Sequence, residues 1–256
     1  MLYFSFLTQA PFGGREAELT LRHYADYFAK SFYLYLTWRS IELGLWVTGA
    51  CILVGYPAAL ILAKHVKGRW REALLLLVVL PFWSNALVRI FSWTMVLRRD
   101  GLIDRLLQDI FPGFPSLGFL YSYPAIAVGL VHSYVPYMIL TCYLSLQAID
   151  DAIIEAARSL GARWWTVFWR IILPLSLPGL LVGVVLIFIP VIGSFMEPRI
   201  LGGRAGTMLG TVIEDQFTEV FDWPFGAALS FLLLAIVLVL LGLCAPLLRR
   251  QIRALE

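Results

Sequence analysis

The residues best placed to bind a partner lie in a polar segment, 150–179, between two long apolar runs. Asp150 can cap the start of a helix, Glu155 follows on that helix, and Gly161 is well placed to end it. Two small side chains beside Glu155 leave room for another backbone to approach closely; they are Ala156 and Ala157. The pattern predicts a surface helix, a turn and a second short helix.

The second short helix is expected to begin near Trp164 and to be broken by Pro174 and Pro178 before the next apolar run. Tryptophan side chains on this helix would anchor it at a membrane surface. An ordinary interfacial loop is the alternative interpretation of the whole segment.

A second group of residues can bind a cation within the apolar runs. Aromatic faces attract an ammonium group, and each such contact contributes about 0.5–2 kcal/mol. The candidates for a substrate pathway are Trp83, Asn85, Trp93, Tyr134 and Tyr137. Because tryptophan and tyrosine are also common at membrane interfaces, a purely structural role is the alternative.

Acidic side chains gather between the last two apolar runs, in 197–224. Glu197 and Asp222 bound this stretch, and both are candidates for attracting cations toward a pathway. A solvated loop without that role is the alternative.

Several other activities find no support in the sequence. No glycine-rich phosphate loop ending in Lys-Ser/Thr is present, so we expect no ATP or magnesium on this chain and no catalytic residues. The three cysteines have no metal spacing, so no metal site is expected. The basic residues are dispersed, which argues against nucleic-acid binding.

The composition indicates a membrane protein. Of 256 residues, 60% are apolar and 14% charged, against about 45–50% and about 25% in soluble domains. A spanning helix needs about 20 mostly apolar residues. Five runs qualify, at about 40–63, 73–97, 123–146, 178–197 and 225–248. They do not alternate as barrel strands would, so the predicted fold is an all-α bundle of transmembrane helices over 40–248.

The first 39 residues form a separate region. Residues 1–12 are apolar but too short to span, and they lack the features of a signal peptide. We expect them to be the end of a truncated first helix. An amphipathic segment that lies on the outer membrane surface is expected to follow, up to residue 39.

Basic residues near the ends of the runs predict the orientation. Ten lie in 64–71, 158–170 and 249–256, against five in 98–105 and 199–204, although the N-terminal region adds four to the latter side. The C-terminal basic tail, 249–256, is therefore predicted to be cytoplasmic, together with the segment that contains Glu155.

The polar segment resembles the coupling loop of ABC importer permeases, with the pattern EAA, three residues, G, nine residues, I-x-L-P. The matching residues are Glu155, Ala156, Ala157, Gly161, Ile171, Leu173 and Pro174. Three further stretches, at 55–64, 81–90 and 222–228, resemble the first permease subunit of spermidine/putrescine importers.

The resemblance, which covers about 40–248, implies a type I importer fold in the bacterial inner membrane. It implies that residues 150–173 dock in a groove of a separate ATPase, with Glu155 as the polar anchor and Gly161 as the turn. The implied partners are a similar second permease, two ATPase subunits, an external substrate-binding protein and membrane lipid. The implied substrate is a polyamine.

Three alternatives remain open. The same architecture carries amino acids, opines, phosphonates, sulfate and ferric iron. A secondary transporter or channel would show internal repeats or intramembrane carboxylates, and neither is apparent. A membrane-embedded enzyme would need an intramembrane His/Asp/Glu constellation, and none is apparent.

Overall fold

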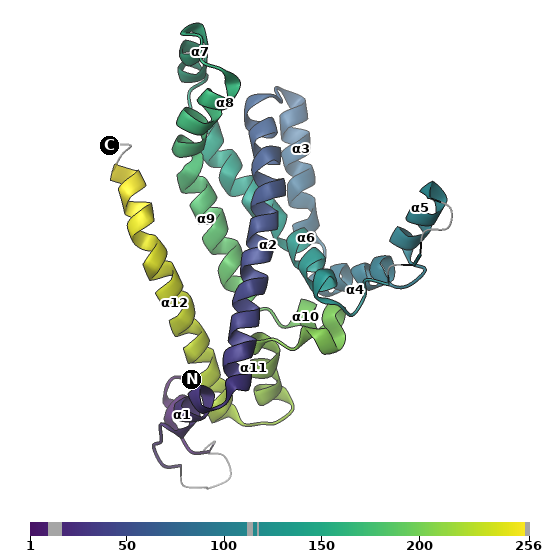
Figure 1. Cartoon of the computed structure of the whole chain (residues 1–256), viewed down its shortest axis with the longest axis vertical. Coiled ribbons are helices and arrows are strands. Elements are labelled where there is room, and N and C mark those ends of the chain that lie inside the picture. The colour runs from purple at the N-terminus through teal and green to yellow at the C-terminus, as the bar shows by residue number, and fades with distance from the viewer. Residues whose placement is uncertain (10–16, 112–114, 117, 254–256) are drawn as a thin grey trace. The chain divides into compact units, whose positions relative to one another are not determined.

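A computed structural model of the chain describes residues 1–9, 17–111, 115–116 and 118–253, with side chains described up to residue 242. The described residues form helices and one isolated bridge between Leu7 and Leu19, so the predicted all-α fold is confirmed. Figure 1 shows the helices, which are α1 Arg22–Ala29, α2 Ser31–Lys64, α3 Arg69–Val79, α4 Ala86–Leu97, α5 Leu102–Ile110, α6 Tyr123–Gln147, α7 Asp151–Ser159, α8 Trp164–Val167, α9 Leu173–Ile192, α10 Met196–Gly202, α11 Leu209–Thr218 and α12 Trp223–Arg253. Short 3₁₀ turns lie at Tyr3–Phe6, Leu80–Trp83 and Gly203–Gly206, and a π-helical turn lies at Phe168–Ile172.

Four stretches of helix are long and apolar enough to cross a membrane: Ser31–Lys64, Tyr123–Gln147, Trp164–Ile192 and Trp223–Gly242. The helices α2, α6 and α12 cover the predicted runs 40–63, 123–146 and 225–248; they begin at most nine residues earlier and end one to five residues later. The last continues as helix to Arg253 and so includes most of the predicted basic tail, of which 254–256 lie outside the described residues.

The predicted single span at 73–97 is wrong, because the helix is interrupted in its middle. α3 ends at Val79, a 3₁₀ turn follows over Leu80–Trp83, and Ser84 is extended with ψ 145°. Pro81 has no N–H and its ring conflicts with the preceding turn, and Ser84 Oγ donates to the Pro81 carbonyl at 2.7 Å. The run is therefore two helices, α3 and α4, which are long and apolar enough for a span only when they are taken together, as a broken span or a re-entrant loop.

The predicted break at Pro174 and Pro178 is also wrong. The chain passes from α8 through the π-helical turn directly into α9, and the Leu173 N–H donates to the Phe168 carbonyl. A π-helical turn rearranges the hydrogen bonds just where Pro174 would leave a carbonyl without its donor, so the helix continues. The span also ends earlier than predicted, at Ile192 rather than 197, in a turn closed by Ser194 N–H to the Val191 carbonyl at 3.1 Å.

The N-terminal region differs from the expected helix end. Of residues 1–12, the described part (1–9) contains only the 3₁₀ turn Tyr3–Phe6, and Leu7 then bridges to Leu19. The expected amphipathic segment is divided between α1 and the first turns of α2. Tyr27 on α1 is buried in a hydrophobic core instead of lying on a membrane surface.

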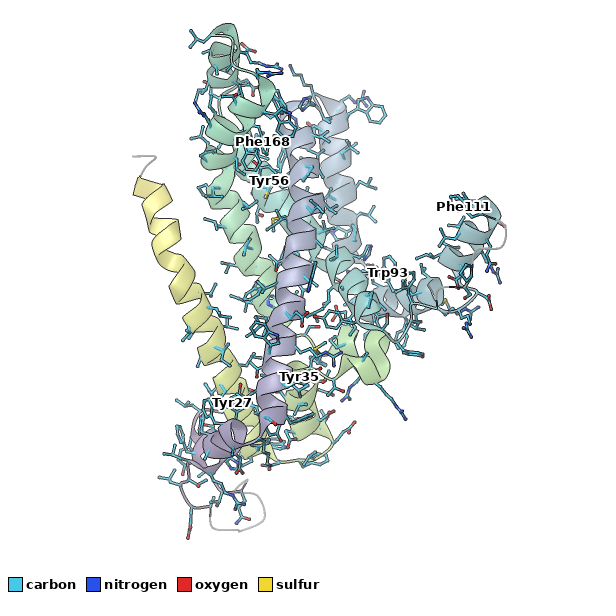
Figure 2. All side chains as sticks on the ribbon, in the orientation of Figure 1. Tyr27, Tyr35, Tyr56, Trp93, Phe111 and Phe168 are labelled. Carbon is cyan, nitrogen blue, oxygen red and sulfur yellow. The ribbon has the colours of Figure 1, made fainter. Side chains whose placement is uncertain are left out.

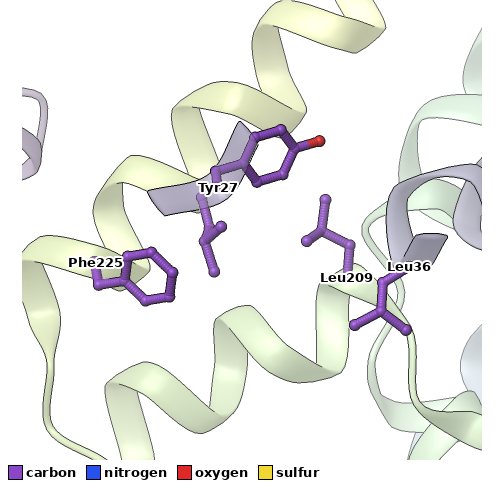
Figure 3. Packing of buried hydrophobic residues seen from close by; sticks show 5 residues of the cluster. Tyr27, Leu36, Leu209 and Phe225 are labelled. Carbon is purple, nitrogen blue, oxygen red and sulfur yellow. The ribbon is translucent and has the colours of Figure 1, made fainter. Parts of the chain in front are cut away.

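The chain divides into two compact units. Unit 1 comprises Met1–Leu45, Ala86–Leu130 and Ile189–Leu240. Unit 2 comprises Trp46–Asn85, Val131–Phe188 and Leu241–Glu256. The core of unit 1 is shown in Figure 3, where Tyr27, Leu36, Leu209 and Phe225 meet from α1, α2, α11 and α12.

Unit 2 is held together by a close approach of α6 and α9. Gly179 and Gly183 lie four residues apart on α9, the small-xxx-small spacing that lets membrane helices pack tightly. A Cβ added at Gly179 would lie 2.4 Å from the Thr141 carbonyl oxygen, and one at Gly183 would lie 2.6 Å from Thr141 Oγ1. The α9 backbone at these glycines therefore lies directly against α6, and there is no room for a methyl group.

Gly179→Ala is expected to destabilise unit 2 by about 1–3 kcal/mol, because the helices must separate to admit the methyl group. Thermal unfolding of the purified chain in detergent would measure the effect as a lowered midpoint. Gly49→Ala on α2 is the matched control, since a Cβ there meets nothing within 4 Å. Equal midpoints for the two variants would contradict the close packing.

Candidate functional site

The predicted coupling segment forms a helical hairpin, α7 and α8, within unit 2 (Figure 1). Asp150 has extended backbone angles, and its carboxylate accepts a hydrogen bond from the Ala152 N–H at 2.9 Å, which confirms the predicted N-terminal cap. The first turn of α7 therefore begins at the residue that the sequence indicates.

The turn after α7 is a Schellman motif. The Ala162 N–H donates to the Ala157 carbonyl at 3.1 Å, and the Gly161 N–H donates to the Arg158 carbonyl at 2.9 Å. Gly161 has φ 84°, in the left-handed region that favours glycine. The predicted helix end at Gly161 is thus confirmed, and this glycine sets the direction in which α8 leaves.

α7 presents an exposed surface of mixed character. None of its nine residues is buried, and Glu155 and Ala156 are exposed beside Ile153 and Leu160, of which Leu160 is 89% exposed. In the described part of the chain, the Glu155 carboxylate takes part in no ion pair or hydrogen bond. An apolar surface around one unpaired carboxylate is suited to docking against a protein with a complementary groove.

Arg158 lies three residues after Glu155 on α7, but in the described part of the chain the two side chains form no ion pair. The Arg158 guanidinium lies over the Trp164 ring instead, 5.7 Å from its centroid. This cation–π contact closes the hairpin and leaves Glu155 available.

The remaining residues of the coupling pattern lie at the end of the π-helical turn and the start of α9. Ile171 and Leu173 are half-buried and Pro174 is exposed, whereas Ile172 between them is completely buried. The pattern therefore positions the hairpin on a continuous helix, with Ile172 as its packing residue.

The structure assembles part of the predicted aromatic site. The rings of Tyr134 and Tyr137 lie with centroids 5.9 Å apart in unit 2, and Phe82 packs edge-to-face on Tyr137 at 4.6 Å. Trp83 is 87% exposed, and Asn85 is exposed in the break before α4. Phe82 is not among the residues predicted from the sequence, although its position next to Trp83 is a usable signal.

Trp93, another candidate for the pathway, lies in unit 1. It is labelled in Figure 2 and lies on α4 in unit 1, where it packs against the apolar cluster that contains Ile90 and Leu201. Its role in unit 1 is packing within that cluster.

The two predicted acidic residues also have local partners in unit 1. Glu197 accepts a hydrogen bond from Ser194 Oγ at 2.9 Å, in the turn before α10. The Asp222 carboxylate accepts from the Phe225 N–H at 3.2 Å and so caps α12. Their positions are explained by these turns.

The acidic stretch 197–224 also contains a second acidic group, in which Asp215 and Glu219 are further candidates for attracting cations. Arg199 on α10 lies among three carboxylates of α11 and the residue after it: Glu214 at 2.9 Å, Asp215 in direct contact, and Glu219 at 3.5 Å. The group holds α10 against α11 and leaves an excess of negative charge.

Several helices of spanning length indicate a polytopic membrane protein. The chain belongs to the family of binding-protein-dependent transport system inner membrane components, whose sequence profile matches residues 55–254. It is therefore a multi-pass permease component of an ABC importer.

Individual relatives agree with this assignment. The chain is 34% identical over 241 residues to the spermidine/putrescine transport system permease protein PotB of Haemophilus influenzae, covering 94% of this chain and 84% of the relative. It is 34% identical to the protein of the same name from Escherichia coli, covering 90% and 82%. Among solved structures, a bacterial ABC transporter that imports alginate has a chain with the same fold, at a TM-score of 0.74 and 19% identity, covering 97% of this chain and 87% of the other.

Proposed function

We propose that this chain is the permease subunit of an ATP-driven importer of polyamines, spermidine or putrescine. The assignment of the substrate rests on one observation: the chain is 34% identical, over nearly its whole length, to a permease named for these two molecules. The aromatic group of Phe82, Tyr134 and Tyr137 supports it chemically, because ring faces attract ammonium groups.

The exposed surface of α7 is the docking site for the ATPase in this proposal. Glu155 supplies the charged anchor, and Ala156 admits the partner's backbone at close range. The chain itself hydrolyses nothing, since ATP and magnesium are bound by the ATPase subunits. Closure of the two ATPases would displace the hairpin and switch the helices between two arrangements.

The assembly that follows from the proposal has two permeases, two ATPases and an external binding protein. The second permease is a similar but different chain. The hairpin, Lys64 and the end of α12 lie on the cytoplasmic side, as the distribution of basic residues favours.

The proposal is tested by reconstituting the chain in liposomes with the ATPase, second permease and binding protein encoded beside it. Uptake of labelled spermidine or putrescine that requires both ATP and the binding protein is the expected result. If the binding protein stimulated ATP hydrolysis but neither polyamine entered the liposomes, the assignment as an importer would be retained and the assignment of the substrate would be wrong. If neither occurred, the functional proposal itself would be wrong.

Trp83→Ala and Tyr134→Ala are expected to lower polyamine uptake by about 3- to 10-fold with little change in basal ATPase activity, because each removes a ring that can face an ammonium group. The two rates are measured on the same liposomes. Trp70→Ala is the matched control for Trp83→Ala, since Trp70 is also an exposed tryptophan of unit 2, at 75% exposure. Equal losses of uptake and ATPase activity would show that both side chains act in packing and not in contact with the substrate.

A further inference from the structure

The C-terminal end of α2 holds the start of the coupling hairpin. Lys64, the last residue of α2, donates through Nζ to the Ile149 carbonyl at 2.6 Å and to Asp151 Oδ1 at 2.7 Å. Its side chain is only 8% exposed, although Asp151 on the other side of the pair is largely open to solvent. Lys64 thus joins α2 to the residue before the α7 cap and to the first turn of α7.

The next residue extends the contact to the second helix of the hairpin. The His65 ring packs edge-to-face on Trp164 of α8, with centroids 6.2 Å apart. Arg158 of α7 covers the same tryptophan at 5.7 Å. We call these five residues, Lys64, His65, Asp151, Arg158 and Trp164, the α2 clamp.

Electrostatics favour the clamp. The hydrogen bond from Lys64 and its positive charge, with smaller contributions from Lys67 and Arg71, hold the pKa of Asp151 below its ordinary value. A depressed carboxyl pKa means that the folded state is favoured while Asp151 is charged, and that this contribution is lost as the pH falls through the acidic range. Asp151 therefore stays ionised and paired at neutral pH.

Within the hairpin, α7 has few contacts that fix its position, whereas α8 continues into α9. α7 has nine residues and buries none of them, and helices of this length are marginal on their own. Its cap at Asp150 and its turn at Gly161 define its shape, but neither ties it to another part of unit 2. The α2 clamp supplies that tie.

α2 can carry a displacement far from the hairpin. It is one uninterrupted helix of 34 residues whose N-terminal part belongs to unit 1 and whose C-terminal part belongs to unit 2. A second contact supports it deeper in unit 2, where the Tyr56 hydroxyl lies 2.7 Å from Ser176 Oγ and the ring packs on Phe168 (Figure 2). The hairpin thus has two routes into the helices: directly along α9, and through the clamp along α2.

We propose that Lys64 is a positioning residue that ties the coupling hairpin to α2, so that displacement of α7 by the ATPase moves α2 together with α9. This inference rests on the proposed function. It assigns Lys64 to transmission of the movement, distinct from the docking surface that Glu155 provides.

Lys64→Met removes the ammonium group and keeps most of the apolar stem. We expect uptake per ATP hydrolysed to fall about 5- to 10-fold, a modest loss for a charged hydrogen bond because Asp151 is partly solvated. Basal ATPase activity and co-purification of the ATPase should be retained, since the docking surface is unchanged. Lys64→Arg should restore coupling, because a guanidinium can donate to both oxygens.

Lys67→Met is the matched control. It removes the same charge three residues away, at an exposed side chain that has no hydrogen bond or ion pair within the described residues. Equal uptake per ATP hydrolysed in Lys64→Met and Lys67→Met would overturn the proposal. Asp151→Ala truncates the exposed partner of Lys64 and must lower uptake per ATP hydrolysed as Lys64→Met does. If Lys64→Met does not assemble, the result for Asp151→Ala tests the proposal in its place.

A measurement that does not depend on transport separates this inference from the proposed function. Amide hydrogen exchange of residues 150–160 in the purified chain should be about 5- to 10-fold faster in Lys64→Met than in Lys67→Met. Equal exchange would overturn the clamp, and faster exchange with unchanged coupling would overturn its role in transmission. If the wild-type assembly neither imported polyamine nor responded to the binding protein, the proposed function would fail, while the exchange result would still decide whether Lys64 positions the hairpin.

Discussion

Replacing Gly161 by valine is expected to abolish most import while leaving the chain inserted in the membrane. Gly161 has φ 84°, where an L-residue costs about 1–2 kcal/mol and a β-branched one more. A Cβ at this position would meet nothing within 4 Å, so the effect comes from the backbone and not from crowding. Because each 1.4 kcal/mol is a factor of ten, we expect uptake in reconstituted liposomes to fall at least about 10-fold.

Gly68→Val is a matched control, because Gly68 also has a positive φ and open space around it. Gly68 has φ 63° and open space around its Cα, and it precedes α3 outside the coupling hairpin. Gly68→Val should lose at least as much stability as Gly161→Val, because Gly68 combines its positive φ with ψ −148°, which is open to almost no residue but glycine. Only Gly161→Val should redirect α8 and disturb docking of the ATPase. Equal uptake per inserted molecule in the two variants would show that the turn at Gly161 has no special role in coupling.

Features that depend on neighbours in the chain could be predicted from the sequence. The Asp150 cap and the turn at Gly161 are local hydrogen-bonding patterns, and the structure contains both where the residue types indicate them. Apolar length predicts α6 to within one residue, because a membrane requires a fixed length of helix whatever packs around it.

Features that depend on competition between local signals could not be predicted in this way. Pro81 and Ser84 interrupt an apolar run, whereas the chain stays helical through Pro174 and Pro178, with a π-helical turn directly before Pro174. Hydrophobicity cannot separate these cases. The helices α5, α10 and α11 are short and of mixed composition, so a search for spanning runs overlooks them.

The candidate site was predicted in part for a related reason. Residue type identifies an aromatic side chain, but tertiary packing decides its neighbours. Tyr134 and Tyr137 lie three residues apart on one helix, so their rings meet. The packing of Trp93 against an apolar cluster of unit 1 does not follow from its residue type. The pairing of Lys64 with Asp151 spans 87 positions of the chain, and only the folded structure reveals it.

Glu155→Ala is expected to have the largest effect on docking and the smallest on folding. The carboxylate is exposed and is bonded to none of the described residues, so its loss should change the free energy of unfolding by no more than about 0.5 kcal/mol. If it is the anchor in the ATPase groove, removing it leaves a partner group buried without its counterpart, which costs about 2–5 kcal/mol. Uptake should then fall at least about 30-fold, with a parallel loss of co-purified ATPase.

Glu72→Ala distinguishes docking from a general effect of charge. Glu72 is an exposed glutamate in the first turn of α3, also in unit 2, and its truncation removes the same group without touching the hairpin. Uptake by this variant should remain within about 2-fold of wild type, as expected for a surface substitution of this kind. If Glu155→Ala retained both uptake and bound ATPase, the proposal that α7 is the docking surface would be wrong. Because the chain's own stability barely depends on Glu155, a loss of uptake in Glu155→Ala could not be attributed to misfolding.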